Sequence, residues 1–276
     1  MKLALCNEVL RHLPFEEQCR VAAAFGCSGL ELAPFTLADD PSNLGTADAQ
    51  RLRAIATDHG IAISSLHWLL VQPPGLSIST PDAALHARTV AFLTRMIAFT
   101  AACGAQVLVH GSPRQRSPAP GQSTADALAR STAAWTALAE PAREHGVTLC
   151  IEPLSAVETP VINTVAEAAA VVDAIGSPAV RTMLDLSAAA QSESEPPSEV
   201  LARYLTSGHI AHVQLNDRNR RGPGQGDTPV APLLRVLRAA GYTGWIALEP
   251  FDYHPDPLSC AAASSAYVRG IWEAIG

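Results

Sequence analysis

The chain has 276 residues, of which 48% are hydrophobic and 16% are charged, so it is long enough to bury one large core or two smaller ones. It carries 19 Lys and Arg against 26 Asp and Glu, which gives a formal net charge of -7. This balance argues against nucleic acid as the main partner, because phosphate binding requires a concentrated basic surface.

Eight short apolar runs alternate with longer Ala-rich segments along the whole chain. A repeat of about 35 residues is typical of the strand-plus-helix unit of a parallel barrel, whose strands are apolar on both faces. The runs predict a single α/β domain over residues 1–276, a (β/α)8 TIM barrel. A doubly wound open sheet is the alternative, but no glycine-rich, dinucleotide-binding turn follows the first run. The predicted strands are Leu3–Cys6, Gly29–Leu32, Ile61–Leu66, Gln106–His110, Val147–Glu152, Val180–Asp185, Ile210–Leu215 and Trp245–Glu249.

The segments between the runs carry helix-end signals. Thr164 followed by Glu167 predicts a capping box. Pro81 and Pro229 each follow a hydroxyl residue, which predicts helices that begin with proline. Ser112–Ser123 and Gln191–Ser198 are rich in Pro, Ser and Gly and predict exposed loops on the C-terminal face of the barrel. Seven glycines precede or start a run, where a left-handed residue ends a helix: Gly26, Gly60, Gly104, Gly146, Gly176, Gly208 and Gly241.

The six cysteines form no CxxC pair and lie mostly in apolar surroundings, where free cysteine behaves as a small hydrophobe. The N-terminus reaches Asn7 and Glu8 too early for the apolar segment of a secretory signal. No run of about 18 apolar residues is present, so no membrane span is expected. These observations predict a cytoplasmic protein without a membrane partner.

Three carboxylates end predicted strands: Glu152 the fifth, Asp185 the sixth and Glu249 the eighth. In a barrel these strand ends converge on one cavity. Carboxylates brought together in an apolar cavity repel one another, so they must raise their pKa values, pair with arginine or share a cation. The alternative for each one alone is a structural salt bridge or a helix cap.

A shared cation resolves this repulsion most directly. Gln214 lies on the seventh run and adds a fourth oxygen to those of Glu152, Asp185 and Glu249. Four oxygen ligands favour one divalent ion such as Mn²⁺, Mg²⁺ or Co²⁺ over a structural Zn²⁺. The sequence therefore predicts a metal site at the C-terminal end of the barrel.

Both glutamates of this set stand before a proline, as Glu152-Pro153 and Glu249-Pro250. A residue before proline is held extended, which keeps both strand ends rigid up to the carboxylate. Two carboxylates on opposite sides of one carbon atom can act as general base and general acid. Glu-Pro is also a common way for a strand to enter a loop.

Four strand-end motifs and one loop carry a family resemblance. The loop is Asn216–Asp227, and the motifs are Ile151-Glu152-Pro153, Met183-Leu184-Asp185, His212-Val213-Gln214 and Ala247-Leu248-Glu249-Pro250-Phe251. In this order they resemble the xylose-isomerase-like sugar isomerase and epimerase superfamily, in the branch of ketose 3-epimerases and hydroxypyruvate isomerase. The resemblance covers nearly the whole chain.

The resemblance implies one divalent ion and proton transfer at a carbon atom next to a carbonyl. It implies that Glu152, Asp185, Gln214 and Glu249 are the metal ligands, with the two glutamates as the acid/base pair. Ketose 3-epimerases have His where Gln214 stands, whereas hydroxypyruvate isomerases have Gln there.

Five further residues are expected to bind substrate. Arg220 matches an arginine that the family places over the substrate oxygens, and Glu158 matches a substrate-contacting glutamate. His67 and His110 end the third and fourth runs, and His212 faces inward by strand parity. The alternatives are a solvated loop residue for Arg220 and hydrogen-bonded structural roles for the histidines.

One position departs from the family pattern. The family commonly has Asp-x-x-His on the sixth strand, where the histidine assists proton movement, but Asp185 is followed by Ala188. We therefore expect a metal-dependent isomerase or epimerase of a sugar or small hydroxy-carbonyl compound. The alternative is a lyase or dehydratase that uses the same site on a keto-sugar-like substrate.

Two other functions are less consistent with the sequence. An abasic-site endonuclease of the same superfamily would need a His-rich site for three zinc ions. It would also need a surface that binds DNA, which the negative net charge opposes. A sugar-binding barrel without activity would bind no ion. Because large barrels of this type often associate, a homo-oligomer is an open alternative to a monomer.

Overall fold

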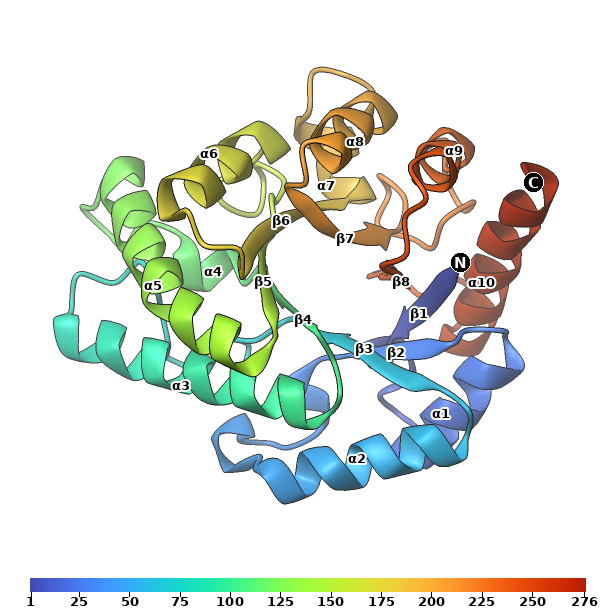
Figure 1. The fold of residues 1–276 in the computed structure, drawn as a ribbon, viewed down its shortest axis with the longest axis horizontal. Helices are drawn as coiled ribbons and strands as arrows, with labels where there is room; N and C mark the ends of the chain where they lie inside the picture. The colour runs from blue at the N-terminus through green and yellow to red at the C-terminus, as the bar shows by residue number, and fades with distance from the viewer.

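The computed structural model describes residues 1–276, and its eight parallel strands close into a barrel in chain order (Figure 1). Closure occurs between the first and last strands, where Ala4 lies opposite Ala247. The predicted TIM barrel is confirmed. The strands are β1 (Lys2–Cys6), β2 (Gly29–Leu32), β3 (Ala62–Leu66), β4 (Val107–His110), β5 (Thr148–Ile151), β6 (Val180–Asp185), β7 (Ile210–Leu215) and β8 (Trp245–Leu248).

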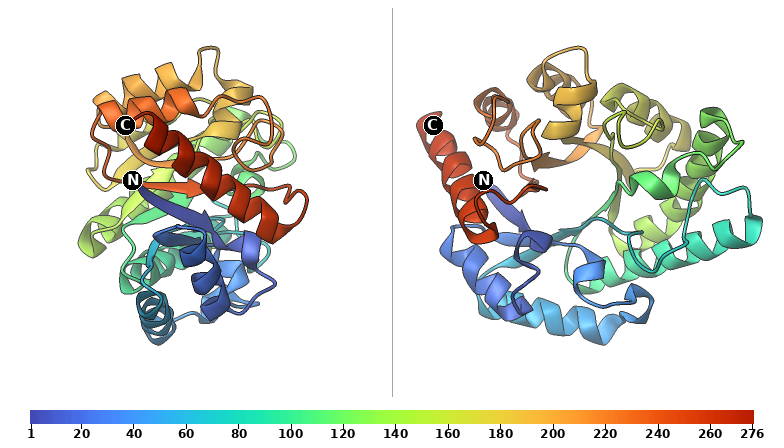
Figure 2. Two further views of the ribbon diagram at one scale, coloured as in Figure 1. Left: turned by 90° about the vertical axis from the view of Figure 1, so that its right-hand side faces the viewer. Right: turned by 180° about the vertical axis from the view of Figure 1, so that it is seen from behind.

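Helices form a ring around the strands, and the N- and C-termini lie near each other in every view (Figures 1 and 2). Three short 3-10 helices are η1 (Asn7–Leu10), η2 (Pro34–Thr36) and η3 (Pro41–Asn43). The α-helices are α1 (Phe15–Ala24), α2 (Thr46–Asp58), α3 (Ala83–Ala102), α4 (Pro113–Arg116), α5 (Thr124–His145), α6 (Val165–Ile175), α7 (Leu186–Ser192), α8 (Pro197–Thr206), α9 (Ala231–Ala239) and α10 (Pro257–Ala274). None of them combines the length and apolar character that crossing a bilayer requires.

Most of the predicted helix ends are confirmed. All seven glycines have positive φ, and Gly146 and Gly176 form the left-handed C-caps of α5 and α6. Thr164 caps α6 together with Glu167. The two proline starts are wrong by two residues. Helix α3 begins after Asp82, whose carboxylate accepts two backbone N–H bonds, and α9 begins at Ala231.

Strand alternation divides the core into two layers. Outward side chains such as Leu108 and Ile151 join the large apolar cluster between the strands and the helices. Inward side chains fill the barrel, among them Val109, Cys150 and Met183. The next inward positions toward the C-terminal ends of the strands are polar, and they form the candidate site. All six cysteines are buried and none is paired.

Candidate active site

Three buried carboxylates meet at the C-terminal mouth of the barrel. Glu152, Asp185 and Glu249 lie two residues beyond Cys150, Met183 and Ala247, which are inward residues of β5, β6 and β8, so strand alternation turns all three inward. They offer oxygens that lie within 4.8 Å of one another. Two unit charges at that separation repel by about 3.5 kcal/mol at an effective dielectric constant of about 20. The three groups therefore cannot all be ionised without a compensating cation.

The pKa values of these groups follow from their burial and their mutual repulsion. Burial raises the pKa of Asp185 to about 7 and that of Glu249 to about 8. Burial, followed by the charges of Glu249 and Asp185, raises the pKa of Glu152 well above its usual range. A divalent ion favours the ionised form of each carboxylate and would reverse these shifts. The donor set thus suits a cation.

Hydrogen bonds hold two of the carboxylates and leave acceptor positions open. Both oxygens of Asp185 accept a bond, Oδ1 from the Ala188 backbone N–H at 2.8 Å and Oδ2 from Asn216 Nδ2 at 2.7 Å. Glu249 Oε1 accepts from Trp68 Nε1 at 3.0 Å, whereas Glu249 Oε2 is buried without a partner. A buried polar oxygen without a hydrogen-bond partner is costly, so it marks a position where a ligand or ion is expected.

Gln214, the fourth predicted ligand, lies beside this cluster and leaves one oxygen free. Its Nε2 donates to Glu31 Oε1 at 2.6 Å and lies 3.4 Å from Nδ1 of His67, the residue that contacts Glu249. Its Oε1 is buried without a partner. The bond to Glu31 therefore commits the amide nitrogen and leaves the carbonyl oxygen available as a ligand.

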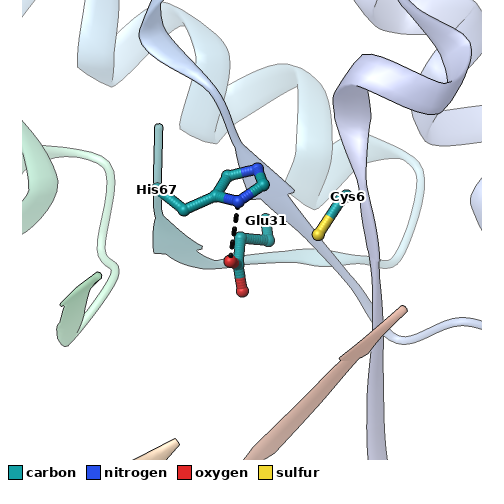
Figure 3. A group of neighbouring side chains, drawn as sticks. All are labelled: Cys6, Glu31 and His67. Atoms are coloured by element: carbon teal, nitrogen blue, oxygen red, sulfur yellow. Dashed lines mark ion pairs between the residues drawn. The ribbon is translucent and has the colours of Figure 1, made fainter. Parts of the chain in front are cut away.

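A polar network below the carboxylates surrounds Glu31. His212 Nε2 lies 2.7 Å from Glu31 Oε2, and Ser65 Oγ donates to the same oxygen at 2.7 Å. Figure 3 shows Cys6 of β1, Glu31 of β2 and His67, which directly follows β3, near one another; His67 Nδ1 lies 3.4 Å from Glu31 Oε1. Burial opposes ionisation of Glu31, but the charges of His212 and His67 outweigh it and lower its pKa to about 2. His212 thus orients a carboxylate within the barrel, one of the structural roles considered for the histidines.

His67 connects this network to the carboxylate cluster. Its Nδ1 lies 3.0 Å from Glu249 Oε1 and its Nε2 lies 3.0 Å from Glu8 Oε2. Burial alone would lower the pKa of His67, but Glu8 and the other acidic groups around it raise the pKa well above its usual range. The imidazole therefore bridges two carboxylates, and its neighbour Trp68 lines the cavity instead.

The expectation that His110 lines the cavity is wrong. His110 is an outward residue of β4, and its ring packs edge-on against Trp135 of α5 at 5.8 Å between centroids. Burial, with a smaller contribution from the charge of Arg116, lowers the pKa of His110 to about 3. The inward position next to it is Gly111.

The segment 112–123 is not wholly an exposed loop as predicted. It contains the short helix α4, whose last residue, Arg116, is completely buried. Arg116 Nη2 donates to the Ile162 carbonyl oxygen at 3.4 Å. Arg116 Nη1 donates to the His110 carbonyl oxygen at 3.5 Å. Burial lowers the pKa of Arg116 to about 10, so the guanidinium remains a cation near Glu152. Arg116 could not be recognised from the sequence, because the Pro-, Ser- and Gly-rich residues around it are typical of a solvent-exposed loop.

Four side chains roof the cavity above the carboxylates. Arg220 Nη1 lies 3.2 Å from Glu158 Oε1, and its guanidinium stacks over the Phe251 ring at 4.3 Å. Phe251 in turn meets Trp68 edge-on. Trp68 and Arg220 both have left-handed backbones, with φ of 52° and 69°, which is strained for such side chains and typical of functional sites. Arg220 and Glu158 therefore pair with each other at the mouth of the barrel, and substrate binding by them stays a prediction.

Gly111 makes room for Glu152. A Cβ added at Gly111 would lie 2.1 Å from Glu152 Oε2, so a side chain there must displace this carboxylate. We expect Gly111→Ala to weaken divalent-ion binding by a factor of about 10 to 100, as other disturbances around metal ligands do. Isothermal titration with Mn²⁺ measures this change. Gly270→Ala is the matched control, because a Cβ there meets open space on α10; equal affinities for the two variants would contradict the prediction.

Comparison with known proteins agrees with this architecture. The sequence profile described as "Xylose isomerase-like TIM barrel" matches residues 19–270. The L-ribulose 3-epimerase of Mesorhizobium japonicum is 30% identical over 230 residues, which cover 82% of this chain and 72% of that protein. A putative hydroxypyruvate isomerase of Streptomyces coelicolor is 27% identical and is matched over 86% of this chain and 85% of its own length. The solved structure of a D-psicose 3-epimerase in the presence of D-fructose superposes with a TM-score of 0.83 at 23% identity, covering 99% of both chains.

The chain belongs to the xylose isomerase-like TIM barrel family. Its relatives include proteins named as ketose 3-epimerases and as a hydroxypyruvate isomerase. The family and the fold predicted from the sequence are therefore confirmed. The names of the relatives support the prediction of a sugar isomerase or epimerase.

Proposed function

We propose that the chain is a divalent-metal-dependent epimerase or isomerase that moves a proton at the carbon next to the carbonyl of a keto-sugar. The observation that carries this proposal is the cluster of Glu152, Asp185 and Glu249, three carboxylates from different strands with oxygens within 4.8 Å. These residues, with Gln214 Oε1, would hold the ion. When bound, it would polarise the substrate carbonyl and acidify the adjacent C–H bond. Mn²⁺, Mg²⁺ and Co²⁺ all suit this oxygen set.

In this proposal Glu249 and Glu152 carry the proton. Glu249 Oε1 is held by Trp68, so Oε2 is the oxygen free to bind the ion or take the proton. Glu152 approaches from the end of β5, beside Gly111, where the absence of a side chain leaves room for its carboxylate. Carboxylates on the two faces of one substrate carbon would act as general base and general acid.

The substrate class is supported by the relatives and by the roof of the cavity. Several relatives are named as epimerases of ketoses. Arg220 and Glu158 offer a guanidinium and a carboxylate to sugar hydroxyls, and their ion pair must rearrange to do so. Because the Asp-x-x-His histidine is replaced by the buried Ala188, proton movement between substrate oxygens falls to other groups.

The decisive experiment combines metal analysis with isotope exchange. We expect the purified protein to contain about one divalent ion per chain and to incorporate deuterium from D₂O next to the carbonyl of a ketose, as seen by proton NMR. Elimination instead yields a product that has lost a hydroxyl or glycosyl group, which mass spectrometry detects. Failure to bind any divalent ion and to exchange with any ketose would falsify the proposal. The lyase alternative, the cytoplasmic location and the oligomeric state stay predictions.

Glu31 is expected to tune ion binding from outside the ligand set. Its Oε1 accepts from Gln214 Nε2 and thereby keeps Gln214 Oε1 free for the ion. We expect Glu31→Gln to loosen this orientation and weaken Mn²⁺ binding by about 10- to 100-fold. Ser65→Ala removes only a bond to the other oxygen of Glu31, so it should have a smaller effect. Unchanged affinity in Glu31→Gln would show that Gln214 is oriented by something else.

A further inference from the structure

A fourth buried carboxylate, Glu8, lies outside the cluster of Glu152, Asp185 and Glu249. Glu8 belongs to η1, which directly follows β1, and its side chain is 8% exposed. Its Oε2 lies 3.0 Å from His67 Nε2, whereas its Oε1 is buried without a partner. Because a buried carboxylate oxygen without a donor or a cation is costly, Oε1 of Glu8 marks a place for a ligand.

His67 cannot satisfy the glutamates on its two sides. An imidazole donates at most two hydrogen bonds, one from each ring nitrogen. His67 Nε2 lies 3.0 Å from Glu8 Oε2 and Nδ1 lies 3.0 Å from Glu249 Oε1, so both donors are used. Glu8 Oε1 and Glu249 Oε2 remain buried without partners. A cation, unlike an imidazole, can bind several such oxygens at once.

The three side chains are spaced as ligands of one ion. Glu8, His67 and Glu249 each offer one atom, and these atoms lie within 4.8 Å of one another. His67 Nε2 and Glu8 Oε2, 3.0 Å apart, subtend roughly 90° at an ion about 2.1 Å from each, as neighbouring octahedral ligands do. With Nε2 bound to the ion, Nδ1 would donate to Glu31 Oε1, which lies 3.4 Å away. A carboxylate is a usual partner for the second nitrogen of a metal-binding histidine.

The other group that contains His67 has no such openings. Cys6, Glu31 and His67 also offer atoms within 4.8 Å of one another. However, both oxygens of Glu31 already accept hydrogen bonds from neighbouring side chains. The Glu8 side of His67 is therefore the place for an ion.

The donor atoms beside Glu8 differ from those of the carboxylate cluster. The predicted ligands of the cluster are all oxygens, which suit Mg²⁺ and Mn²⁺. His67 adds a nitrogen, and imidazole favours ions such as Co²⁺, Ni²⁺ and Zn²⁺. The angle of roughly 90° suits octahedral Co²⁺ better than tetrahedral Zn²⁺.

We propose that Glu8, His67 and Glu249 form a second divalent-cation site for a nitrogen-binding transition-metal ion, with Glu249 shared between this ion and that of the carboxylate cluster. The second site goes beyond the proposed function and does not depend on it, since Glu8 and His67 are outside the predicted ligand set. It fills after the cluster, because an ion there must first break the contacts of His67 with the two glutamates. The protein as purified would therefore hold about one ion, and added Co²⁺ would supply the second.

The test counts Co²⁺ ions per chain by elemental analysis after equilibrium dialysis. We expect about two Co²⁺ in the wild type but about one Mg²⁺, because Mg²⁺ avoids nitrogen ligands. Glu8→Gln and His67→Ala should each reduce the Co²⁺ count to about one. Asp185→Asn, which removes a ligand of the cluster only, should also hold about one Co²⁺, at the second site. His145→Ala is the control for adventitious binding to surface histidines, because His145 is exposed at the end of α5, and it should match the wild type.

Proton NMR identifies the site that holds the ion in each variant. An imidazole bound to Co²⁺ shows an exchangeable N–H signal shifted far outside the normal range, whereas oxygen ligands give no such signal. We expect this signal in the wild type and in Asp185→Asn, and not in Glu8→Gln. The wild-type spectrum decides the question even where a variant fails to fold.

The outcomes separate the second site from the activity. A wild type that binds only about one Co²⁺, or two Co²⁺ without the shifted N–H signal, overturns the second site and leaves the proposed function standing. Absence of deuterium exchange with every ketose overturns the proposed function. In that case a wild type with two Co²⁺ and the shifted signal would still support the second site.

Discussion

Replacing Glu249 with Gln is expected to reduce deuterium exchange by a factor of about 10² to 10⁴, the usual contribution of a positioned acid or base. The substitution preserves shape, and an amide oxygen can still accept from Trp68 Nε1. What it removes is the proton-accepting capacity and the charge of Oε2, the buried oxygen that has no partner. Proton NMR in D₂O with Mn²⁺ present measures the exchange rate, as the rate at which the signal of the C–H group next to the carbonyl disappears.

Glu199→Gln provides the control, because Glu199 is an exposed glutamate on α8 away from the cavity. It should exchange at the wild-type rate. The Glu249→Gln variant should also remain folded, since a carboxyl whose pKa is raised by burial does not stabilise the folded state when ionised. A variant that exchanges within a factor of about ten of the wild type would remove Glu249 from the acid/base pair.

The metal-free protein is expected to lose stability as pH rises from 6.5 to 8.0. Asp185 and Glu249 keep their protons up to pH values of about 7 and 8 when folded, but unfolded carboxyls release them near pH 4. The unfolded state therefore binds fewer protons than the folded state in this window, and the free energy of unfolding falls by up to about 1.4 kcal/mol per pH unit for each such group. The raised pKa of His67 acts in the same direction.

Urea unfolding in the presence of EDTA at pH 6.5 and 8.0 measures this loss. Below pH 6.5 the lowered pKa of His110 would oppose the trend, which is why the window starts there. Mn²⁺ at about 100 times its dissociation constant should add about 2.7 kcal/mol and flatten the pH dependence. In the metal-free protein, Glu249→Gln should reduce the pH dependence of the unfolding free energy, because one of the titrating carboxyls is removed. A metal-free protein that is equally stable at both pH values would show that these carboxyls do not titrate as buried groups.

The strands could be predicted from sequence because their signal is strong and repeated. Each is a short apolar run, and every strand after the first follows a glycine near the end of the preceding helix, as Gly146 and Gly176 do. Errors concentrate where two local signals compete. At α3 the hydroxyl residue before Pro81 predicts a helix that begins with this proline, but the Asp82 carboxylate accepts from two backbone N–H groups and fixes the start two residues later.

The site was predictable in part. Glu152, Asp185 and Glu249 are identified by their position at the ends of apolar runs, and in the structure each lies two residues beyond an inward core residue. The same rule fails for His110, since the run before it is apolar on both faces and does not show which residues point inward. Arg116 and Gly111 depend on contacts with residues far along the chain, Ile162 and Glu152, which no local pattern encodes.

The six unpaired thiols give the barrel an internal set of chemical probes. Cys6 and Cys150 lie in the lumen, whereas Cys19, Cys27 and Cys103 lie between the strands and the helices. A thiol-alkylating reagent can reach either group only when the layer around it opens. The order in which the cysteines are modified during denaturation would therefore reveal whether the helical ring separates from the sheet before the ring of strands itself comes apart.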